Sequence, residues 1–362
     1  MRLGVEAAIV DGVLLPGDVE VVDGRIAGVA LGGPGRGIAV PGFVDLQVNG
    51  FGGVDFADAD ADGYRRAGEA LLATGVTAFQ PTLITAPEDD LVAALAEVPV
   101  TPIGPRLLGV HLEGPFLSPR RLGAHSAGAQ RDPDPALLTR LLDAGPVGYV
   151  TLAPELPGAL ELIDLLHARG IVVSCGHTDA TAAEANAAFD RGVGTITHVF
   201  NAMRPLSHRD PGIVGAALAR DDVILQAILD GHHLAEETAR VVWRAAPGRV
   251  ALVTDAIAAT GLGDGRSRLG DVSVVVQDGV VRREDGMLAG SVLTMAQAVR
   301  NLHALDVPLV DAVAAATSVP ARVLGRHDLG VLRPGGAADL VVLDDRLELR
   351  TVLVAGSERV AA

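Results

Sequence analysis

Apolar and polar residues alternate along the chain in a pattern that differs between its middle and its ends. Between residues 41 and 329, short apolar runs alternate with Ala- and Leu-rich segments of helical pattern, several of which end on Gly, a common helix stop. Eight such β/α alternations predict a (β/α)8 barrel of the TIM type. The expected strands cover residues 43–48, 77–82, 106–113, 147–153, 171–176, 194–199, 223–229 and 250–255.

The two ends of the chain read as short β-segments separated by turns. Asp11-Gly12 and Asp23-Gly24 are typical β-hairpin dipeptides, and the C-terminal segments ADLVVLDD and LRTVLVAG have the same character. We therefore expect both ends to build one small β-sandwich domain, and we expect a hairpin-like insert, VSVVVQDGVV, after the eighth strand. The expected domains are residues 1–40 with 330–362 for the sandwich, and 41–329 for the catalytic barrel.

Composition narrows the classes of protein that remain. Hydrophobic residues make up 49% of the 362 residues, which is enough for a substantial core and excludes global disorder. The net charge of −16 argues against non-specific nucleic-acid binding, because a phosphate backbone repels an acidic surface. An anionic small substrate stays compatible with this charge, since it needs only a local Arg or a helix N-terminus.

Cysteine use and the N-terminal sequence indicate a compartment. The single cysteine, Cys175, rules out an intramolecular disulfide framework and suits a reducing environment, where it is interpreted as a small core residue. Glu6 and Asp11 interrupt the region in which a signal peptide needs an apolar stretch, and no run reaches the roughly 18 apolar residues of a membrane span. We expect a cytoplasmic protein without membrane or nucleic-acid partners.

The chain contains no lysine, so all 29 basic residues are arginines. This excludes Schiff-base catalysis, phosphate binding through a P-loop lysine, and a metal pair bridged by a carbamylated lysine.

Chemically useful side chains gather at the expected strand ends. In a TIM barrel the active site lies at the carboxyl ends of the strands. The polar residues at these positions are His111 and Glu113 in GVHLEGP, His177 in SCGHTDA, His198 and Asn201 in THVFNAM, Asp230, His232 and His233 in LDGHH, and Asp255 in VTDAIAATG.

Three of these residues have the donor atoms of a metal site. Glu113, His177 and His198 form a His2Glu set, which suits a catalytic zinc with one position left for water, and Asp255 could move a proton between that water and a leaving group. Each residue alone also has a structural interpretation. A single His near a strand end more often forms structural hydrogen bonds than binds a metal, and Glu113 could cap a helix. Together, at equivalent ends of separate strands, they favour a metal. His111 shares a strand face with Glu113 and is expected to support the ligands or to pack.

Several segments also occur in the order known from one family. The chain resembles the N-acetylglucosamine-6-phosphate deacetylases of the amidohydrolase superfamily from about Pro41 nearly to its C-terminus. Any one motif is weakly specific, whereas eight in order are highly specific. The eight are PGFVDLQVNGFGG, HLEGPFLSP with GAHS, CGHTDA, THVFNAM, HRDPGIVGA, ILDGHHL, LVTDAIAATG and LAGSVLTM.

The resemblance implies roles for the matching residues. Glu113, His177 and His198 match the metal ligands of the family, Asp255 matches its catalytic acid/base, and His125 is a second catalytic residue that contacts the sugar and the acetamide carbonyl. The implied substrate-binding residues are Ala124, His125, Asn201, Ala202, Arg209, Asp230, His232, His233, Leu288, Ala289 and Gly290.

The same resemblance implies where the phosphate is held. Arg209, His233 and backbone N–H groups near Ala202 match its binding positions, and some of these come from a neighbouring subunit in the family, so a homodimer with a phosphate site near the subunit interface is implied. The segment RPLSHRDPG independently supplies Arg204, His208 and Arg209, the local positive charge that a phosphosugar needs. A solvated loop is the alternative interpretation for Arg204 and His208.

The end of the first expected strand argues for a single metal. Many amidohydrolases carry His-x-His there for a second metal, whereas this chain has Gln47 and Asn49, neutral amides that bind zinc poorly. We therefore expect one divalent metal per subunit, zinc, with iron(II) and manganese(II) as alternatives. Gln47 and Asn49 are expected to lie buried beside it with their hydrogen-bonding capacity satisfied.

The expected reaction is hydrolysis of N-acetyl-D-glucosamine 6-phosphate to D-glucosamine 6-phosphate and acetate. One alternative is deacetylation of an epimeric or differently acylated amino-sugar phosphate, such as N-acetylgalactosamine 6-phosphate. Hydrolysis of a cyclic amide is disfavoured, because those enzymes usually need the missing His-x-His or lysine. A non-catalytic sugar-phosphate sensor on the same barrel would predict a broken ligand set or a lost Asp255. In this chain the ligand set is complete and Asp255 is present.

Overall fold

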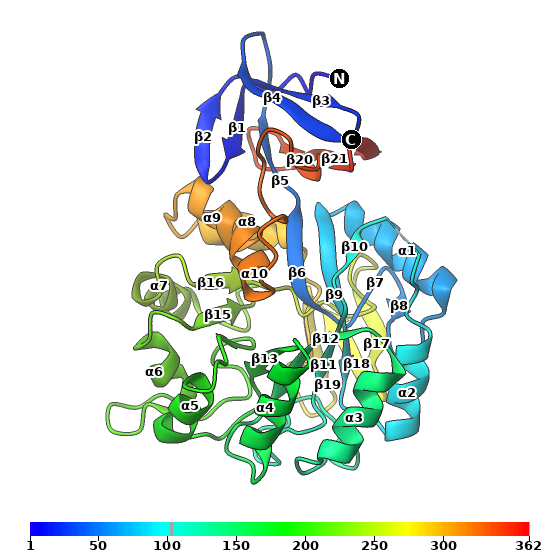
Figure 1. Cartoon of the computed structure of the whole chain (residues 1–362), viewed down its shortest axis with the longest axis vertical. Coiled ribbons are helices and arrows are strands. Elements are labelled where there is room, and N and C mark those ends of the chain that lie inside the picture. The colour runs from blue at the N-terminus through cyan, green and yellow to red at the C-terminus, as the bar shows by residue number, and fades with distance from the viewer. Residues whose placement is uncertain (102–103, 362) are drawn as a thin grey trace.

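The computed structural model describes residues 1–101 and 104–361. Figure 1 shows a barrel surrounded by helices and, at one end of it, a smaller group of strands that contains both chain termini. The expected division into a barrel and a sheet built from both ends is therefore confirmed as an architecture. The domain boundaries at residues 40 and 330 stay a prediction.

Parallel strands form the barrel wall in the order β6, β9, β11, β12, β13, β14, β15 and β16. The first of these meets the segment after the last at its carboxyl end, where Asp255 N–H donates to Gln47 O at 3.0 Å and Asn49 N–H donates to Ala256 O at 2.8 Å. This closure brings the ends of the first and eighth strands together. The bounds are β6 Phe43–Val48, β9 Val76–Ile84, β11 Val110–Glu113, β12 Val147–Leu152, β13 Val172–Cys175, β14 Thr195–Ile196, β15 Ile224–Ala227 and β16 Val250–Leu252.

Every expected barrel strand is present, so the (β/α)8 prediction is confirmed. The third expected strand, 106–113, is interrupted and divides into β10 (Arg106–Leu107) and β11. Gly109 lies at the break with a φ of +85°, in the left-handed region that favours glycine. A Cβ at this position would lie 3.0 Å from Pro146 O, so the close approach of the next strand also requires glycine.

Helices cover the outside of the barrel (Figure 1). Their starts follow local sequence: the Asp60 side chain accepts from Gly63 N–H at the first turn of α1, and Thr181 and Glu184 form a capping box at α5. The helices are α1 Ala61–Leu72, α2 Glu88–Ala96, α3 Pro135–Ala144, α4 Ala159–Ala168, α5 Ala182–Phe189, α6 Gly212–Leu218, α7 Glu236–Ala245, α8 Met295–His303, α9 Leu309–Ala315 and α10 Ser318–Val323.

The small domain packs a six-stranded sheet against a two-stranded one. The larger sheet has the order β2-β1-β5-β20-β21-β22, and β3 pairs with β4. Val19, Ile26, Ala39 and Leu340 belong to one buried cluster that joins both sheets, which confirms the predicted sandwich. The strands are β1 Ala7–Val10, β2 Val13–Pro16, β3 Asp18–Val22, β4 Arg25–Leu31, β5 Ile38–Pro41, β20 Leu340–Leu343, β21 Leu349–Val354 and β22 Ser357–Ala361.

The predicted insert after the eighth strand is a three-stranded antiparallel sheet of β17 (Gly265–Leu269), β18 (Val272–Gln277) and β19 (Val280–Arg283). Its Leu269 and Val274 share a buried cluster with Ala124 from a barrel loop. The insert therefore lies against the carboxyl ends of the barrel strands. No helix among residues 1–101 and 104–361 is long and apolar enough to cross a bilayer.

Candidate metal and substrate site

A hollow of about 380 Å³ lies at the carboxyl ends of the barrel strands, below the insert. Most of the residues predicted for the site line this hollow. They are Asn49, Glu113, Ala124, His125, His177, His198, Asn201, Ala202, His233, Asp255, Leu288, Ala289 and Gly290.

Three imidazoles surround the buried carboxylate of Glu113. Glu113 Oε1 lies 2.9 Å from His198 Nε2 and 3.2 Å from His177 Nε2, and these two nitrogens lie 3.1 Å apart. Glu113 Oε2 lies 3.5 Å from His125 Nε2. One possible ligand atom from each of Glu113, His125 and His177 lies within 4.8 Å of the others. The structure thus brings together a Glu/His/His group that could hold a metal.

The chain bends sharply where it presents these side chains. His177, His198 and Asp255 have φ values of +47°, +28° and +51°, in the left-handed region that non-glycine residues rarely adopt. Such conformations cost free energy and persist where the surrounding structure enforces them, which is common at functional sites.

Hydrogen bonds on the far side of the rings determine what each imidazole offers. His177 Nδ1 lies 2.9 Å from Arg121 O, and a carbonyl only accepts, so Nδ1 carries the proton and Nε2 presents a lone pair to the centre. His125 differs, because the Thr85 backbone N–H donates to its Nδ1 at 3.2 Å. The proton of neutral His125 therefore lies on Nε2, which points toward Glu113.

Burial and the local charges set the ionisation of this group. Burial lowers the pKa of His177 to about 4, so its ring is neutral at neutral pH. For Glu113, burial alone raises the pKa, but the three imidazoles around the carboxylate hold it well below its ordinary value. For His198, burial lowers the pKa, whereas the hydrogen bond to Glu113 raises it above the ordinary value. A carboxylate beside neutral His177 matches the donor requirements of a divalent metal.

Two amides hold Asp255. Its Oδ1 accepts from Asn49 Nδ2 at 2.7 Å and from Gln47 Nε2 at 3.2 Å, and Gln47 Nε2 also donates to Glu113 Oε1 at 3.0 Å. Burial, reinforced by the charge of Glu113, raises the pKa of Asp255 to about 6.

The expectation that Gln47 and Asn49 are fully hydrogen-bonded is wrong. Gln47 Oε1 and Asn49 Oδ1 are buried without a partner among the described residues. Each amide turns its nitrogen toward carboxylates, because carboxylates only accept, and this leaves each carbonyl oxygen without a donor among the described residues.

His111 is fully buried below the site, and it does not line the hollow. Its Nε2 lies 2.7 Å from Thr151 Oγ1 and its Nδ1 lies 3.3 Å from Thr82 Oγ1. Burial lowers its pKa to about 4. These contacts are those of a supporting residue in the barrel interior.

Three of the predicted substrate-binding residues, Arg209, Asp230 and His232, do not line the hollow. Asp230 instead supports His233: its Oδ2 lies 2.7 Å from His233 Nδ1, and its Oδ1 accepts the backbone N–H groups of His232 and His233. Burial raises the pKa of Asp230, but the His233 hydrogen bond outweighs it and the pKa lies below its ordinary value. Arg209 lies exposed on the loop after Arg204.

Sequence and structure comparisons relate this chain to known proteins. The profile described as Amidohydrolase family matches residues 38–359. The chain is 42% identical over 342 residues to the N-acetylglucosamine-6-phosphate deacetylase of Mus musculus, covering 89% of this chain and 83% of that protein. It is 37% identical over 324 residues to the N-acetylgalactosamine-6-phosphate deacetylase of Escherichia coli O157:H7, covering 87% of this chain and 86% of that protein.

A solved structure agrees over the whole length. A mutant N-acetyl-D-glucosamine-6-phosphate deacetylase from Mycobacterium smegmatis, in complex with N-acetyl-D-glucosamine-6-phosphate, matches with a TM-score of 0.95 and 38% identity, covering 99% of each chain. The chain belongs to the amidohydrolase family. Membership implies a divalent metal, and this amidohydrolase has a Glu/His/His group to hold one.

Sequence reasoning missed several residues around the amidohydrolase site. Arg120 and Arg121 line the hollow and both contact the Asp179 carboxylate, at 3.2 and 2.7 Å. Both arginines lie in SPRRLGAHS, shortly before the Ala124-His125 pair, so their position in the sequence could have identified them as site residues. Thr85, which determines the His125 tautomer, carried no signal, because its role depends on a contact 40 positions away.

The charge predicted for RPLSHRDPG is partly neutralised. Arg204 donates from Nε and Nη2 to the Asp210 carboxylate, at 2.6 Å for the shortest contact, and so is not free to bind an anion. Arg209 and His208 are both exposed, and for Arg209 no ion pair is found among the described residues.

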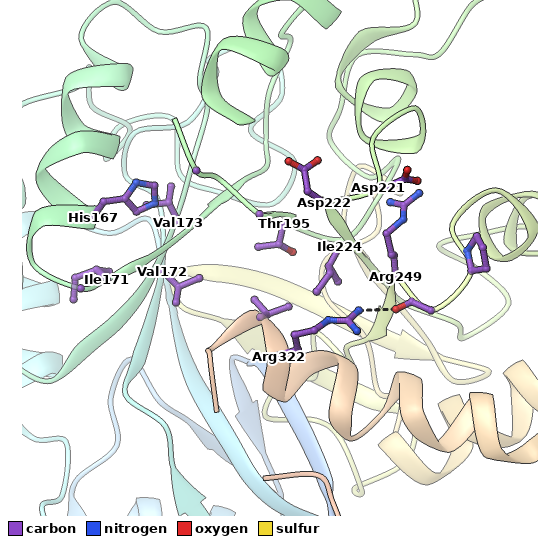
Figure 2. Close-up of a pocket in the computed structure, with 16 residues that line it drawn as sticks. His167, Ile171, Val172, Val173, Thr195, Asp221, Asp222, Ile224, Arg249 and Arg322 are labelled. Carbon is purple, nitrogen blue, oxygen red and sulfur yellow. Dashed lines mark hydrogen bonds between the residues drawn. The ribbon is translucent and has the colours of Figure 1, made fainter. Parts of the chain in front are cut away.

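A second hollow, of about 900 Å³, lies at the amino ends of the barrel strands. Figure 2 shows His167, Thr195, Arg249 and Arg322 among its lining residues. Its arginines are bound to the protein itself: Arg249 Nη1 donates to Val223 O at 2.6 Å and Arg322 Nη2 donates to Gly248 O at 2.6 Å. Among the described residues, the group of possible metal ligands lies at the opposite end of the amidohydrolase barrel.

Proposed function

We propose that this amidohydrolase is a metal-dependent deacetylase that hydrolyses N-acetyl-D-glucosamine 6-phosphate to D-glucosamine 6-phosphate and acetate. The observation that carries the proposal is the Glu113, His177 and His198 cluster with Asp255 in the same hollow. The names of the relatives described above support the choice of substrate.

The proposed metal ligands are Glu113, His177 and His198. Each offers a donor atom within 3.2 Å of the other two, and His177 already presents the lone pair of its Nε2. His125 satisfies the same distance criterion with Glu113 and His177, but the Thr85 N–H places its proton on Nε2, so neutral His125 has no lone pair to give there. We propose one cation per subunit, zinc, with iron(II) and manganese(II) compatible with the same donors.

A bound cation would supply Lewis-acid activation of water and of the acyl oxygen. Asp255 would accept the proton of the attacking water and then deliver it to the amine nitrogen as the C–N bond breaks. Because Oδ1 is held by Gln47 and Asn49, Oδ2 is the atom of Asp255 that carries this proton. His125 would donate from Nε2 to the oxygen that gains negative charge, a contribution of about 3 kcal/mol for a well-placed donor.

The phosphate would bind at the edge of the hollow, at His233 and the backbone near Ala202. We propose that Arg209 completes this site from the neighbouring subunit of a homodimer. The support is that His233 and Ala202 line the hollow, whereas Arg209 of the same chain is exposed and does not. Remote binding of this kind orients the reacting amide.

Mixing two impaired variants tests the proposed dimer. Asp255→Asn should lose turnover by about 10³-fold, because the proton acceptor is gone, while metal and substrate stay bound. Arg209→Ala should weaken substrate binding. In mixed dimers, the Arg209→Ala subunit keeps Asp255 and receives Arg209 from its partner, so acetate release should recover after subunit exchange. Absence of recovery in demonstrated heterodimers would place Arg209 in its own subunit's site.

Acetate release from the purified protein tests the function itself. The protein, with its metal counted per chain, is assayed on N-acetylglucosamine 6-phosphate and on its galacto epimer. We expect one metal and faster turnover of the gluco substrate. Faster turnover of the galacto substrate would favour the second relative's activity, and tight binding of either phosphosugar without acetate would identify a sensor. We also propose that the protein works in the cytoplasm, since its only cysteine, Cys175, is buried and unpaired.

A further inference from the structure

Asn49 lies beside the proton-transfer residue with an unused hydrogen-bonding atom. Its side chain is 2% exposed and lines the hollow, and its Nδ2 donates to Asp255 Oδ1 at 2.7 Å. Its Oδ1 is buried and has no partner among the described residues. Buried polar atoms are nearly always paired. Gln47 Oε1 is unpaired as well, but of these two amides only Asn49 lines the hollow, so only Asn49 can meet a donor that arrives with the substrate.

The orientation of this amide follows from its neighbours. A carboxylate cannot donate, so the amide nitrogen of Asn49 must face Asp255 and the amide oxygen must point away from it. The backbone is held as well, because Asn49 N–H donates to Ala256 O at 2.8 Å, which ties the residue to the segment that carries Asp255. The Asn49 acceptor and the Asp255 carboxylate therefore have a fixed relation to each other.

We propose that Asn49 Oδ1 accepts a hydrogen bond from the N–H of the scissile amide. This inference rests on the proposed deacetylase function and names a specificity of the same site: the substrate is a secondary amide, with one hydrogen on the nitrogen that becomes the leaving group. Asn49 is a positioning residue for Asp255 through Nδ2 and contacts the substrate through Oδ1.

The contact has a clear chemical use. When the C–N bond breaks, the nitrogen needs a proton on the side that faces Asp255 Oδ2. An N–H held toward Asn49 directs the nitrogen's developing lone pair away from Asn49 and leaves it available to Asp255. The bond that forms is N–H, from the Asp255 proton, and the bond that breaks is C–N. Asn49 itself transfers no proton.

Gln47 provides a matched control on the same strand. It also donates an amide N–H to Asp255 Oδ1, at 3.2 Å, and its Oε1 is also buried without a partner. Unlike Asn49, it does not line the hollow. Loss of Gln47 should therefore disturb Asp255 without removing a substrate contact.

The test compares an amide with the ester that lacks the N–H. The probes are N-acetylglucosamine 6-phosphate and freshly prepared 2-O-acetyl-glucose 6-phosphate, each assayed with wild type, Asn49→Ala and Gln47→Ala. We expect Asn49→Ala to lower kcat/KM about 100-fold for the amide but only about tenfold for the ester, so the amide-to-ester ratio falls about tenfold. Gln47→Ala should lower both substrates by the same factor and leave the ratio unchanged.

Equal losses on both substrates in Asn49→Ala, or an equal fall of the ratio in Gln47→Ala, would overturn the proposal. Metal content and melting temperature are measured for each variant. If Asn49→Ala fails to fold or to hold metal, Asn49→Ser is compared in its place, and the same two ratios decide. Failure of the proposed function can be told apart from failure of the Asn49 proposal, because the wild-type protein would then release no acetate from the amide.

Discussion

The hollow at the carboxyl ends of the barrel strands is smaller than the one at their amino ends, about 380 against 900 Å³, yet it gathers the imidazoles and carboxylates of the candidate site. At the amino end, the buried guanidinium of Arg249 donates to backbone carbonyls, and Asp222 pairs with Arg220. At the carboxyl end, Asn49 Oδ1 and His198 Nδ1 have no partner among the described residues.

The difference teaches that the side chains a hollow gathers, rather than its volume, distinguish the working end of this barrel. At the amino end, Arg249, Arg322 and Asp222 form hydrogen bonds or ion pairs within the protein. At the carboxyl end, His177, His198 and Asp255 have left-handed backbone conformations, and Asn49 Oδ1 has no partner among the described residues. In TIM barrels the two faces divide stability and function in the same way.

The largest expected effect is a difference in metal affinity and acetate release between two histidine-to-alanine variants, one at each end of the barrel. His177→Ala should lower metal affinity by at least about 100-fold and abolish acetate release, because it removes a proposed ligand. His167→Ala, at the amino-end hollow, should leave both unchanged. Metal counted per chain after dialysis, together with acetate release, checks the pair. Equal metal retention in both variants would contradict the prediction that the metal binds at the carboxyl end of the barrel.

A smaller effect is expected from the amino end, and on stability alone. Arg249→Met should lower the free energy of unfolding by about 2–3 kcal/mol, because the carbonyls of Val223, Ala217 and Leu218 lose a buried donor. The kcat of the folded fraction should not change. Arg322→Met is the control: Arg322 is exposed, with a bond to Gly248 O, and should cost less than about 0.5 kcal/mol.

Urea unfolding monitored by circular dichroism, with kcat measured on the same samples, separates the two properties. A fall in kcat without loss of stability in Arg249→Met would mean that the amino end takes part in the reaction.

The smallest expected effect is a pH dependence of stability from Asp45, a fully buried residue of β6 between the two ends. Burial raises its pKa to about 7, although Thr254 Oγ1 donates to its Oδ2 at 2.6 Å. Because the folded pKa exceeds the unfolded value, this contribution is present below about pH 4 and is lost as the pH rises through about 7. Asp45→Asn mimics the neutral acid and should remove the dependence.

The measurement is the difference in unfolding free energy between wild type and Asp45→Asn at pH 5.5 and pH 8. Other carboxyl groups titrate in both proteins and cancel. From pH 5.5 to pH 8 the wild type should lose about 2 kcal/mol relative to the variant, since the pH rises by about 1.5 before it reaches the pKa of about 7 and each pH unit corresponds to about 1.4 kcal/mol. Parallel pH profiles would show that Asp45 is ionised in the folded protein throughout this range.

Much of the fold and of the candidate site was predictable from local sequence. Alternating apolar runs predicted the barrel strands, because burial on both faces of a parallel sheet leaves a readable pattern. Glu113 and His177 were identifiable because strand ends are where such a barrel places its chemistry. The break at Gly109 was missed, since it depends on the close approach of the next strand at Pro146.

Contacts across the barrel were not predictable in the same way. The unpaired oxygens of Gln47 and Asn49 depend on the closure between the first and eighth strands, which brings Asp255 to them from more than 200 positions away. The position of Arg209 outside its own hollow likewise depends on how a loop folds back, because Arg204 pairs with Asp210.

The sequence by itself determined which chemical groups this protein has at its strand ends: three carboxylates, several imidazoles and three amides, without any lysine. Periodicity is a local property, so it can be read from neighbouring residues. Only the tertiary structure decided which atom of each group faces the centre, as with His125, whose tautomer is set by the Thr85 N–H. Hydrogen-bond partners of buried groups come from distant strands, and barrel closure alone brings them within reach.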